Sequence, residues 1–338
     1  MEVRHISSPY CRSAKIPMPT THFAHGFAFD PTYGYTLETL LQLPPPPEPA
    51  DFTAFWQGLF AQAQAVRVAP QLQEIASLVP AQRLFMVEYT SLGHFRIKGW
   101  LTVPKDEPIE RGAVIGHGYG GRDGPDREVP ITRCAVLFPC ARGLSLSAHP
   151  AIPANPARHV LYSIQNRHAY ILGGCAADIW CGATALLQLF PAAAARLDYL
   201  GISFGGGVGA LALPWDERFH SAHLCVPSFG NHPVRLDCPC VGSGEAVRTY
   251  HREGGGITLE VLRYFDAASA ARYLRIPMHI AAARFDPAVP PPGQFSIYNA
   301  IDSPKRLFML SAGHFDYPDQ SAEQRRLFAE LKDFFKAA

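Results

Sequence analysis

The stretch DYLGISFGGGVGALAL, residues 198–213, joins an apolar run to a serine and then to three consecutive glycines. Glycine is unfavourable inside a helix, so a glycine cluster where a helix should begin needs a structural reason. Residues 201–205, GISFG, form the pattern G-x-S-x-G, with an expected strand before them and an expected helix after them. Such a turn strains the serine backbone and exposes its hydroxyl, provided that the flanking residues are small. The stretch therefore predicts a nucleophile at Ser203, the alternative being a tight turn with an incidental serine.

A serine nucleophile needs a general base, and the base needs a carboxylate that orients it. With this motif, the acid and then the histidine follow the serine along the chain. Asp286 follows an expected strand, MHIAAARF at 278–285, and His314 lies in a loop after the expected strand RLFMLS at 306–311. We therefore predict that His314 is the base and later the acid, and that Asp286 orients it. The structural alternatives are a surface aspartate and a loop-capping histidine.

Acyl transfer also needs backbone donors for the oxygen that becomes negative in the transition state. One donor is the N–H of Phe204, directly after the serine. The loop HGYGG, residues 117–121, follows the expected strand GAVIG and offers the N–H of Tyr119 as the second. The alternative for this loop is a flexible strand end without a role.

The rest of the chain alternates expected strands with expected helices, which predicts a mostly parallel sheet flanked by helices. Two alternating runs, 83–92 and 95–104, predict a hairpin that would form an antiparallel edge. Residues 160–190 are mostly helix-like, and 51–65 predict a helix with Asp51 as N-cap. We divide the chain into an N-terminal arm with a Pro-rich connector, 1–50, and an α/β domain, 51–338.

Composition argues against several classes of protein. The 338 residues carry 30 basic and 29 acidic side chains with no long run of either sign, which gives no basis for binding nucleic acid or a membrane. No apolar run reaches the roughly 20 residues of a membrane span, and the N-terminus lacks the apolar segment of a secretory signal. We therefore expect a cytoplasmic protein.

The cysteines and histidines give no metal-binding pattern, so we expect no metal site. Cys238 and Cys240 form CPC, a spacing too short for an ordinary disulfide framework, and their role stays open. Four cysteines lie in apolar runs and are expected to be buried thiols: Cys134, Cys175, Cys181 and Cys225.

The chain resembles the acetyl xylan esterase / cephalosporin C deacetylase family of α/β-hydrolases over most of its length. The most specific segment is YFDAASAARYLRIPMHIAAARFDPAVPPPGQFSIYNAI, 264–301. Further matches are DFTAFW, IKGWLTVP, HGYGG, the serine motif and AGHFD. The resemblance implies an α/β-hydrolase fold with an N-terminal helical extension. It also implies deacetylation of small acetylated sugars or oligosaccharides, often with activity on cephalosporin acetates.

The family carries a Ser–His–Asp triad and two oxyanion N–H groups at positions that match the five residues predicted above. Its members are typically hexamers whose active sites face an interior cavity, and they need no cofactor. Two departures stand out. Phe204 replaces the family's usual glutamine and adds apolar bulk near the acyl group, and ARGLSLSAHP, 141–150, replaces an RGQG-like segment.

The leading hypothesis is therefore a serine esterase that acts on a small acetylated carbohydrate, in an enzyme that forms a homo-oligomer. A peptidase or thioesterase could use the same triad, although peptidases of this fold usually carry a further large domain. A catalytically silent hydrolase fold that serves as a binding protein is the alternative from another class.

Overall fold

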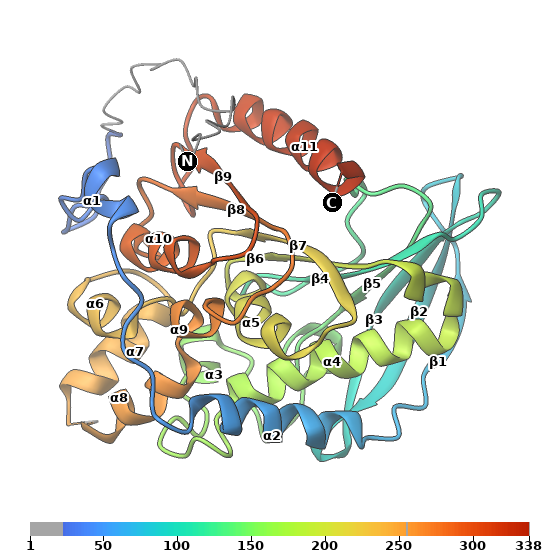
Figure 1. Cartoon of the computed structure of the whole chain (residues 1–338), viewed down its shortest axis with the longest axis horizontal. Coiled ribbons are helices and arrows are strands. Elements are labelled where there is room, and N and C mark those ends of the chain that lie inside the picture. The colour runs from blue at the N-terminus through green and yellow to red at the C-terminus, as the bar shows by residue number, and fades with distance from the viewer. Residues whose placement is uncertain (1–22, 255, 338) are drawn as a thin grey trace, which may run out of the picture.

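A single nine-stranded sheet runs through the computed structural model, which describes residues 23–254 and 256–337 (Figure 1). The strands are ordered β1-β2-β3-β5-β4-β6-β7-β8-β9 across the sheet. Their bounds are β1 (Gln71–Ile75), β2 (Gln82–Ser91), β3 (Phe95–Pro104), β4 (Arg111–Gly116), β5 (Cys134–Pro139), β6 (Leu197–Ile202), β7 (Phe219–Cys225), β8 (Met278–Ala283) and β9 (Lys305–Leu310).

The sheet combines a parallel body with an antiparallel edge. The six neighbouring strands β5, β4, β6, β7, β8 and β9 pair in parallel. Strand β2 pairs antiparallel with both β1 and β3, and β3 pairs antiparallel with β5. This confirms the predicted mostly parallel sheet and the hairpin at its edge. Strand β1 was not predicted, because its alternation in QLQEI is too polar to stand out.

Helices cover both faces of the sheet (Figure 1). One face packs on α2, α4, α5, α9 and α10 in the larger core, and the opposite face packs on α11 through Leu331, Phe334 and Phe335. The helices are α1 (Leu37–Leu41), α2 (Phe52–Gln64), α3 (Pro156–His159), α4 (Ile171–Leu189), α5 (Phe204–Ala212), α6 (His232–Asp237), α7 (Ser243–Arg252), α8 (Gly256–Leu262), α9 (Ala267–Ala271), α10 (Pro291–Ala300) and α11 (Gln320–Ala337).

Helix α4 is apolar on nearly all sides because it lies inside the molecule. By length and composition alone it could cross a membrane, but 78% of its apolar window is buried in the structure. The prediction that residues 160–190 are mostly helical was right from residue 171 onward and wrong for the residues before it. Helix α4 begins at Ile171, and residues 160–170 form turns, since the polar segment QNRH interrupts the apolar pattern.

The N-terminal part of the described chain lies along the domain. Residues 43–49 of the Pro-rich connector form neither helix nor strand, and their carbonyl groups accept hydrogen bonds from the domain. Asp51 precedes α2 as predicted, but its side chain does not cap the helix. It accepts hydrogen bonds from Arg167 and Tyr264 instead. The division of the chain at residue 50 stays a prediction.

Candidate active site

Ser203 lies at the turn between β6 and α5, with φ 53° and ψ −112°. This is a strained conformation for a residue with a side chain. A Cβ atom at Gly201 would lie 2.6 Å from the Gly205 carbonyl oxygen, and one at Gly205 would lie 2.7 Å from the Gly116 carbonyl carbon. The glycines on both sides of Ser203 are therefore needed because backbone segments approach them closely.

The structure brings the three side chains of the predicted triad together, although 111 residues separate Ser203 from His314. His314 Nε2 lies 2.9 Å from Ser203 Oγ. His314 Nδ1 lies 2.8 Å from Asp286 Oδ2 and 3.1 Å from Oδ1. Because a carboxylate only accepts, Nδ1–H donates to Asp286, which leaves Nε2 free to accept the proton of the serine hydroxyl.

Asp286 is fully buried and strongly held. Its Oδ1 accepts from the N–H groups of Ala288 and Val289, both at 2.9 Å, in the turn that follows β8. Its Oδ2 accepts from Gln294 Nε2 at 3.0 Å, and Gln294 also accepts from the N–H of Ala283 at 2.8 Å. Gln294 was not predicted, because an amide inside an apolar helix pattern does not reveal its partner.

The pKa of His314 reflects two opposing effects. Burial lowers it, while the hydrogen bond and the negative charge of Asp286 raise it, and the net result is a pKa above the ordinary value of 6.5. The His314 side chain keeps 28% of its surface exposed, so a substrate can reach it. An imidazole of this kind can take a proton from a hydroxyl and return it to a leaving group.

The loop after β4 lies against the serine turn. A Cβ atom at Gly118 would lie 3.7 Å from Ser203 Cβ, and the Tyr119 ring packs on the Phe204 ring at a centroid distance of 4.3 Å. Phe204 is the first residue of α5, and the first N–H groups of a helix have no acceptor within it. The structure thus brings the two predicted oxyanion residues together beside Ser203, and their role stays a prediction.

Aromatic residues of the N-terminal arm pack on the residues next to Asp286 and His314. The Phe23 ring lies 5.2 Å from the Phe285 ring and 5.6 Å from the Phe315 ring, and Phe27 lies 6.1 Å from Phe315. From the sequence, this arm was identified only as an N-terminal segment, residues 1–50, with a Pro-rich connector. Its position beside the triad loops could not be predicted, because no periodic pattern in the arm indicates a partner.

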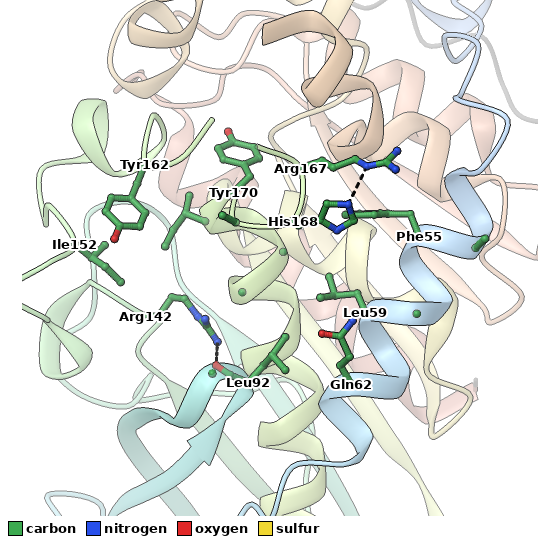
Figure 2. A pocket seen from close by; sticks show the side chains of 17 residues that line it. Phe55, Leu59, Gln62, Leu92, Arg142, Ile152, Tyr162, Arg167, His168 and Tyr170 are labelled. Atoms are coloured by element: carbon green, nitrogen blue, oxygen red, sulfur yellow. Dashed lines mark hydrogen bonds between the residues drawn. The ribbon is translucent and has the colours of Figure 1, made fainter. Parts of the chain in front are cut away.

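The cavity drawn in Figure 2, of about 550 Å³, lies between α2 and the start of α4, and Ser203 is not among its lining residues. Its two arginines are already paired, Arg142 with Asp178 and Arg167 with Asp51. In residues 23–254 and 256–337, no three His, Cys, Asp or Glu side chains are grouped as metal ligands would be.

The cysteines of the CPC segment are free and buried. Burial raises the pKa of Cys238 and of Cys240 to about 11, so both thiols are protonated at neutral pH. Of the four cysteines expected to be buried, Cys134, Cys175 and Cys181 are buried and Cys225 is partly so. The thiols therefore add no nucleophile to the site.

Comparisons with known proteins agree on a single fold. The chain resembles an acetyl xylan esterase from Paenibacillus sp. R4, with a TM-score of 0.76, 20% identity, and coverage of 88% of this chain and 99% of the other. It also resembles Acetyl Xylan Esterase 1 from Thermoanaerobacterium sp. JW/SL YS485, with a TM-score of 0.75 and 19% identity. That comparison covers 90% of this chain and 99% of the other. The likeness to an acylaminoacyl peptidase from Pyrococcus horikoshii is weaker, with a TM-score of 0.57 and 13% identity. It covers 81% of this chain and 42% of the peptidase.

These likenesses confirm the α/β-hydrolase fold. The family-level match is more specific, because residues 36–331 match the family described as acetyl xylan esterase (AXE1). The match covers both sheet edges and every strand, and it begins just after the arm residues that pack beside the triad loops. The chain therefore belongs to the acetyl xylan esterase family and is a carboxylic ester hydrolase.

Proposed function

We propose that this protein is a serine esterase that removes acetyl groups from acetylated sugars or xylo-oligosaccharides, with cephalosporin-type acetates as further substrates. The observation that carries the proposal is the continuous hydrogen-bonded series from Ser203 through His314 to Asp286 at a strained turn. Membership of the acetyl xylan esterase family supports the acetyl group as the one that is transferred.

The proposed reaction passes through an acyl-enzyme. His314 Nε2 takes the proton of Ser203 Oγ while that oxygen attacks the ester carbonyl carbon, and the N–H groups of Tyr119 and Phe204 stabilise the resulting oxyanion. The carbon–oxygen bond to the sugar breaks, and the imidazolium returns its proton to the departing alcohol. Water then attacks the acetyl-serine with the same base, which releases acetate and restores the serine hydroxyl.

Hydrolysis of p-nitrophenyl acetate by wild type and Ser203→Ala tests this mechanism. The substitution should lower kcat by roughly 10⁶-fold, as loss of the nucleophile does in a well-studied serine protease. Ser243→Ala, on α7, is the matched control and should keep wild-type activity. Circular dichroism and thermal unfolding establish that both variants are folded. A Ser203→Ala enzyme with unchanged kcat would refute the assignment of this residue.

The chain length of the acyl group tests the second part of the proposal. Phe204 is buried, and its ring lies beside those of Tyr119 and Phe229, so little room remains for a long acyl chain. We expect kcat/KM to fall from p-nitrophenyl acetate to the butyrate and octanoate esters. Acetate release from acetylated xylo-oligosaccharides should exceed release from simple alkyl acetates.

Two alternatives remain distinct outcomes of these assays. Faster cleavage of a peptide amide or a thioester than of an acetyl ester would favour the peptidase or thioesterase function. Failure to cleave any of these substrates would indicate a binding protein. We further propose the homo-oligomer, a hexamer by family resemblance, which light scattering of the purified protein would test.

A further inference from the structure

Arg235, on α6, is a buried cation without a carboxylate partner. Only 5% of its surface is exposed, and no described Asp or Glu lies within ion-pair distance of it. Its hydrogen bond goes from Nη1 to His232 Nδ1 at 3.3 Å. Two partly buried arginines differ, because Arg111 is paired with Asp198 and Arg142 with Asp178. A buried charge without a counter-charge is costly, so Arg235 needs a reason.

His232 does not supply the missing negative charge. Its Nε2–H donates to the Phe265 carbonyl oxygen at 3.1 Å, so Nδ1 is the neutral acceptor that Arg235 uses. Burial and then the charge of Arg235 lower the pKa of His232 to about 3. The remaining nitrogens of Arg235 have no acceptor in the described part of the protein. None of them is among the fully buried polar atoms that lack a hydrogen-bond partner. They are therefore free to bind a ligand.

Two tyrosines belong to the same region, but only the hydroxyl of Tyr170 is free to donate. Tyr119 donates its hydroxyl proton to His159 Nδ1 at 3.3 Å, because His159 Nε2–H donates to the Arg142 carbonyl oxygen. Tyr170 is buried. Its hydroxyl oxygen is one of the few fully buried side-chain polar atoms, among the described residues, that have no hydrogen-bond partner. Figure 2 shows this hydroxyl pointing away from Leu59 and Arg142 in the neighbouring cavity. Burial raises the pKa of Tyr170 and Tyr119 and the nearby charge of Arg235 lowers it, yet Arg235 hydrogen-bonds to neither hydroxyl.

This group of residues lies directly behind the serine turn. The Tyr119 ring packs on Phe204 at 4.3 Å, and the Phe204 ring lies 6.1 Å from that of Phe229. The guanidinium carbon of Arg235 lies 5.9 Å from the centre of the Phe229 ring. Two aromatic rings thus connect the unpaired cation to the residue that follows Ser203.

We propose that Arg235, with the hydroxyl of Tyr170, forms a subsite that binds a carboxylate of the substrate. This inference rests on the proposed function of Ser203. A guanidinium presents paired donors that match the two oxygens of a carboxylate, and a protonated tyrosine donates to the same group. One cation and one neutral hydroxyl fit a single negative charge. The preferred ester therefore carries a free carboxylate, either in its acyl part or in its alcohol part.

Matched pairs of esters separate the two positions of the carboxylate. For the acyl side, monomethyl succinate is compared with methyl butyrate, which has the same number of acyl carbons and no charge. For the alcohol side, O-acetyl galacturonic acid is compared with O-acetyl galactose. The measured quantity is the ratio of kcat/KM for the charged ester to that for the neutral ester. We expect a ratio of roughly 10 or more for one pair, because hydrogen bonds to a charged group strengthen binding by about this factor.

Substitutions then show whether Arg235 is responsible for that ratio. Arg235→Met should lower it roughly tenfold or more, and Arg235→Lys should retain part of it. Tyr170→Phe should lower the ratio by a smaller factor and raise the melting temperature, because it removes an unpaired buried hydroxyl. Arg248→Met, on α7, is the control: Arg248 is paired with Glu245, and its loss should leave the ratio unchanged.

The outcomes are decisive in each direction. A ratio near one for both pairs in the wild type overturns the subsite while the esterase function stands, provided that p-nitrophenyl acetate is cleaved through Ser203. A high ratio that persists in folded Arg235→Met also overturns it. If Arg235→Met does not fold, Arg235→Lys and Tyr170→Phe still test the proposal, since a purely structural role would not change the ratio.

Discussion

The backbone N–H of Asp286 donates to the carbonyl oxygen of Pro31 at 3.1 Å, so the triad carboxylate is tied to the N-terminal arm. Arm residues Phe23 and Phe27 also pack on Phe315, which directly follows His314. The family match begins at residue 36, after these contacts. The arm therefore adds support to both the acid and the base from outside the matched region.

The first prediction concerns this support. The double variant Phe23→Ala/Phe27→Ala should lower kcat by about tenfold, since aromatic contacts of this kind hold the His314 loop in place. KM should change less, because the arm acts on positioning. Steady-state kinetics measures both constants. Leu78→Ala, which removes a 90% exposed side chain, is the control and should behave like wild type. An unchanged kcat in the double variant would show that the arm is not required to position the His314 loop.

The second prediction concerns pH. The proposed mechanism needs neutral His314, whose pKa is raised above 6.5, so kcat/KM should fall as the pH drops through that raised pKa. Asp286→Asn removes the charge that raises it, so the acid limb should move to lower pH. The same change should lower kcat by roughly 10⁴-fold. A pH–rate profile whose acid limb is identical in both proteins would contradict this assignment.

The raised pKa also has a consequence for stability. Protonated His314 is stabilised by Asp286 in the folded state, so this contribution is present below the unfolded pKa and is lost as the pH rises through the folded one. The free energy of unfolding from urea titrations at several pH values would show this loss in wild type. Asp286→Asn should not show it.

The third prediction concerns Gly313, next to the base. A Cβ atom there would overlap Asp286 Oδ2 sterically, so Gly313→Ala must displace the carboxylate. We expect kcat to fall roughly 100-fold, as for other small displacements of catalytic groups. Gly58→Ala is the control, because nothing lies within 4 Å of its Cβ position on α2. It should raise the free energy of unfolding by about 0.5–1 kcal/mol with wild-type kcat.

The fourth prediction concerns the ion pair between Arg142 and Asp178, whose side chains approach to 2.6 Å and are 12% and 3% exposed. Arg142→Met should lower the free energy of unfolding by about 3–5 kcal/mol, because it leaves a buried carboxylate unpaired. The double variant Arg142→Met/Asp178→Leu should recover much of the loss. Urea titration of the three proteins measures both effects, and an additive loss in the double variant would rule out this explanation.

The sequence predicted much of the fold and the order of the triad, because both leave local signals. Ser203 lies in a motif that needs small neighbours, and Asp286 and His314 follow apolar strand patterns directly. Gln294, the start of α4 and the contacts of the arm were missed. The arm contacts depend on partners far away in the chain, and Gln294 depends on Asp286 across a turn, so local periodicity reveals neither pairing. The start of α4 depends on the short polar segment QNRH, which an average over the whole apolar stretch does not show.

The serine and histidine loops follow β6 and β9, which are separated in the sheet by β7 and β8. Catalytic competence consequently depends on four adjacent strands being in register at once. Enzyme activity therefore reports on the pairing of strands that are far apart in the chain. During refolding, activity should return no earlier than the slowest of these strand pairings forms.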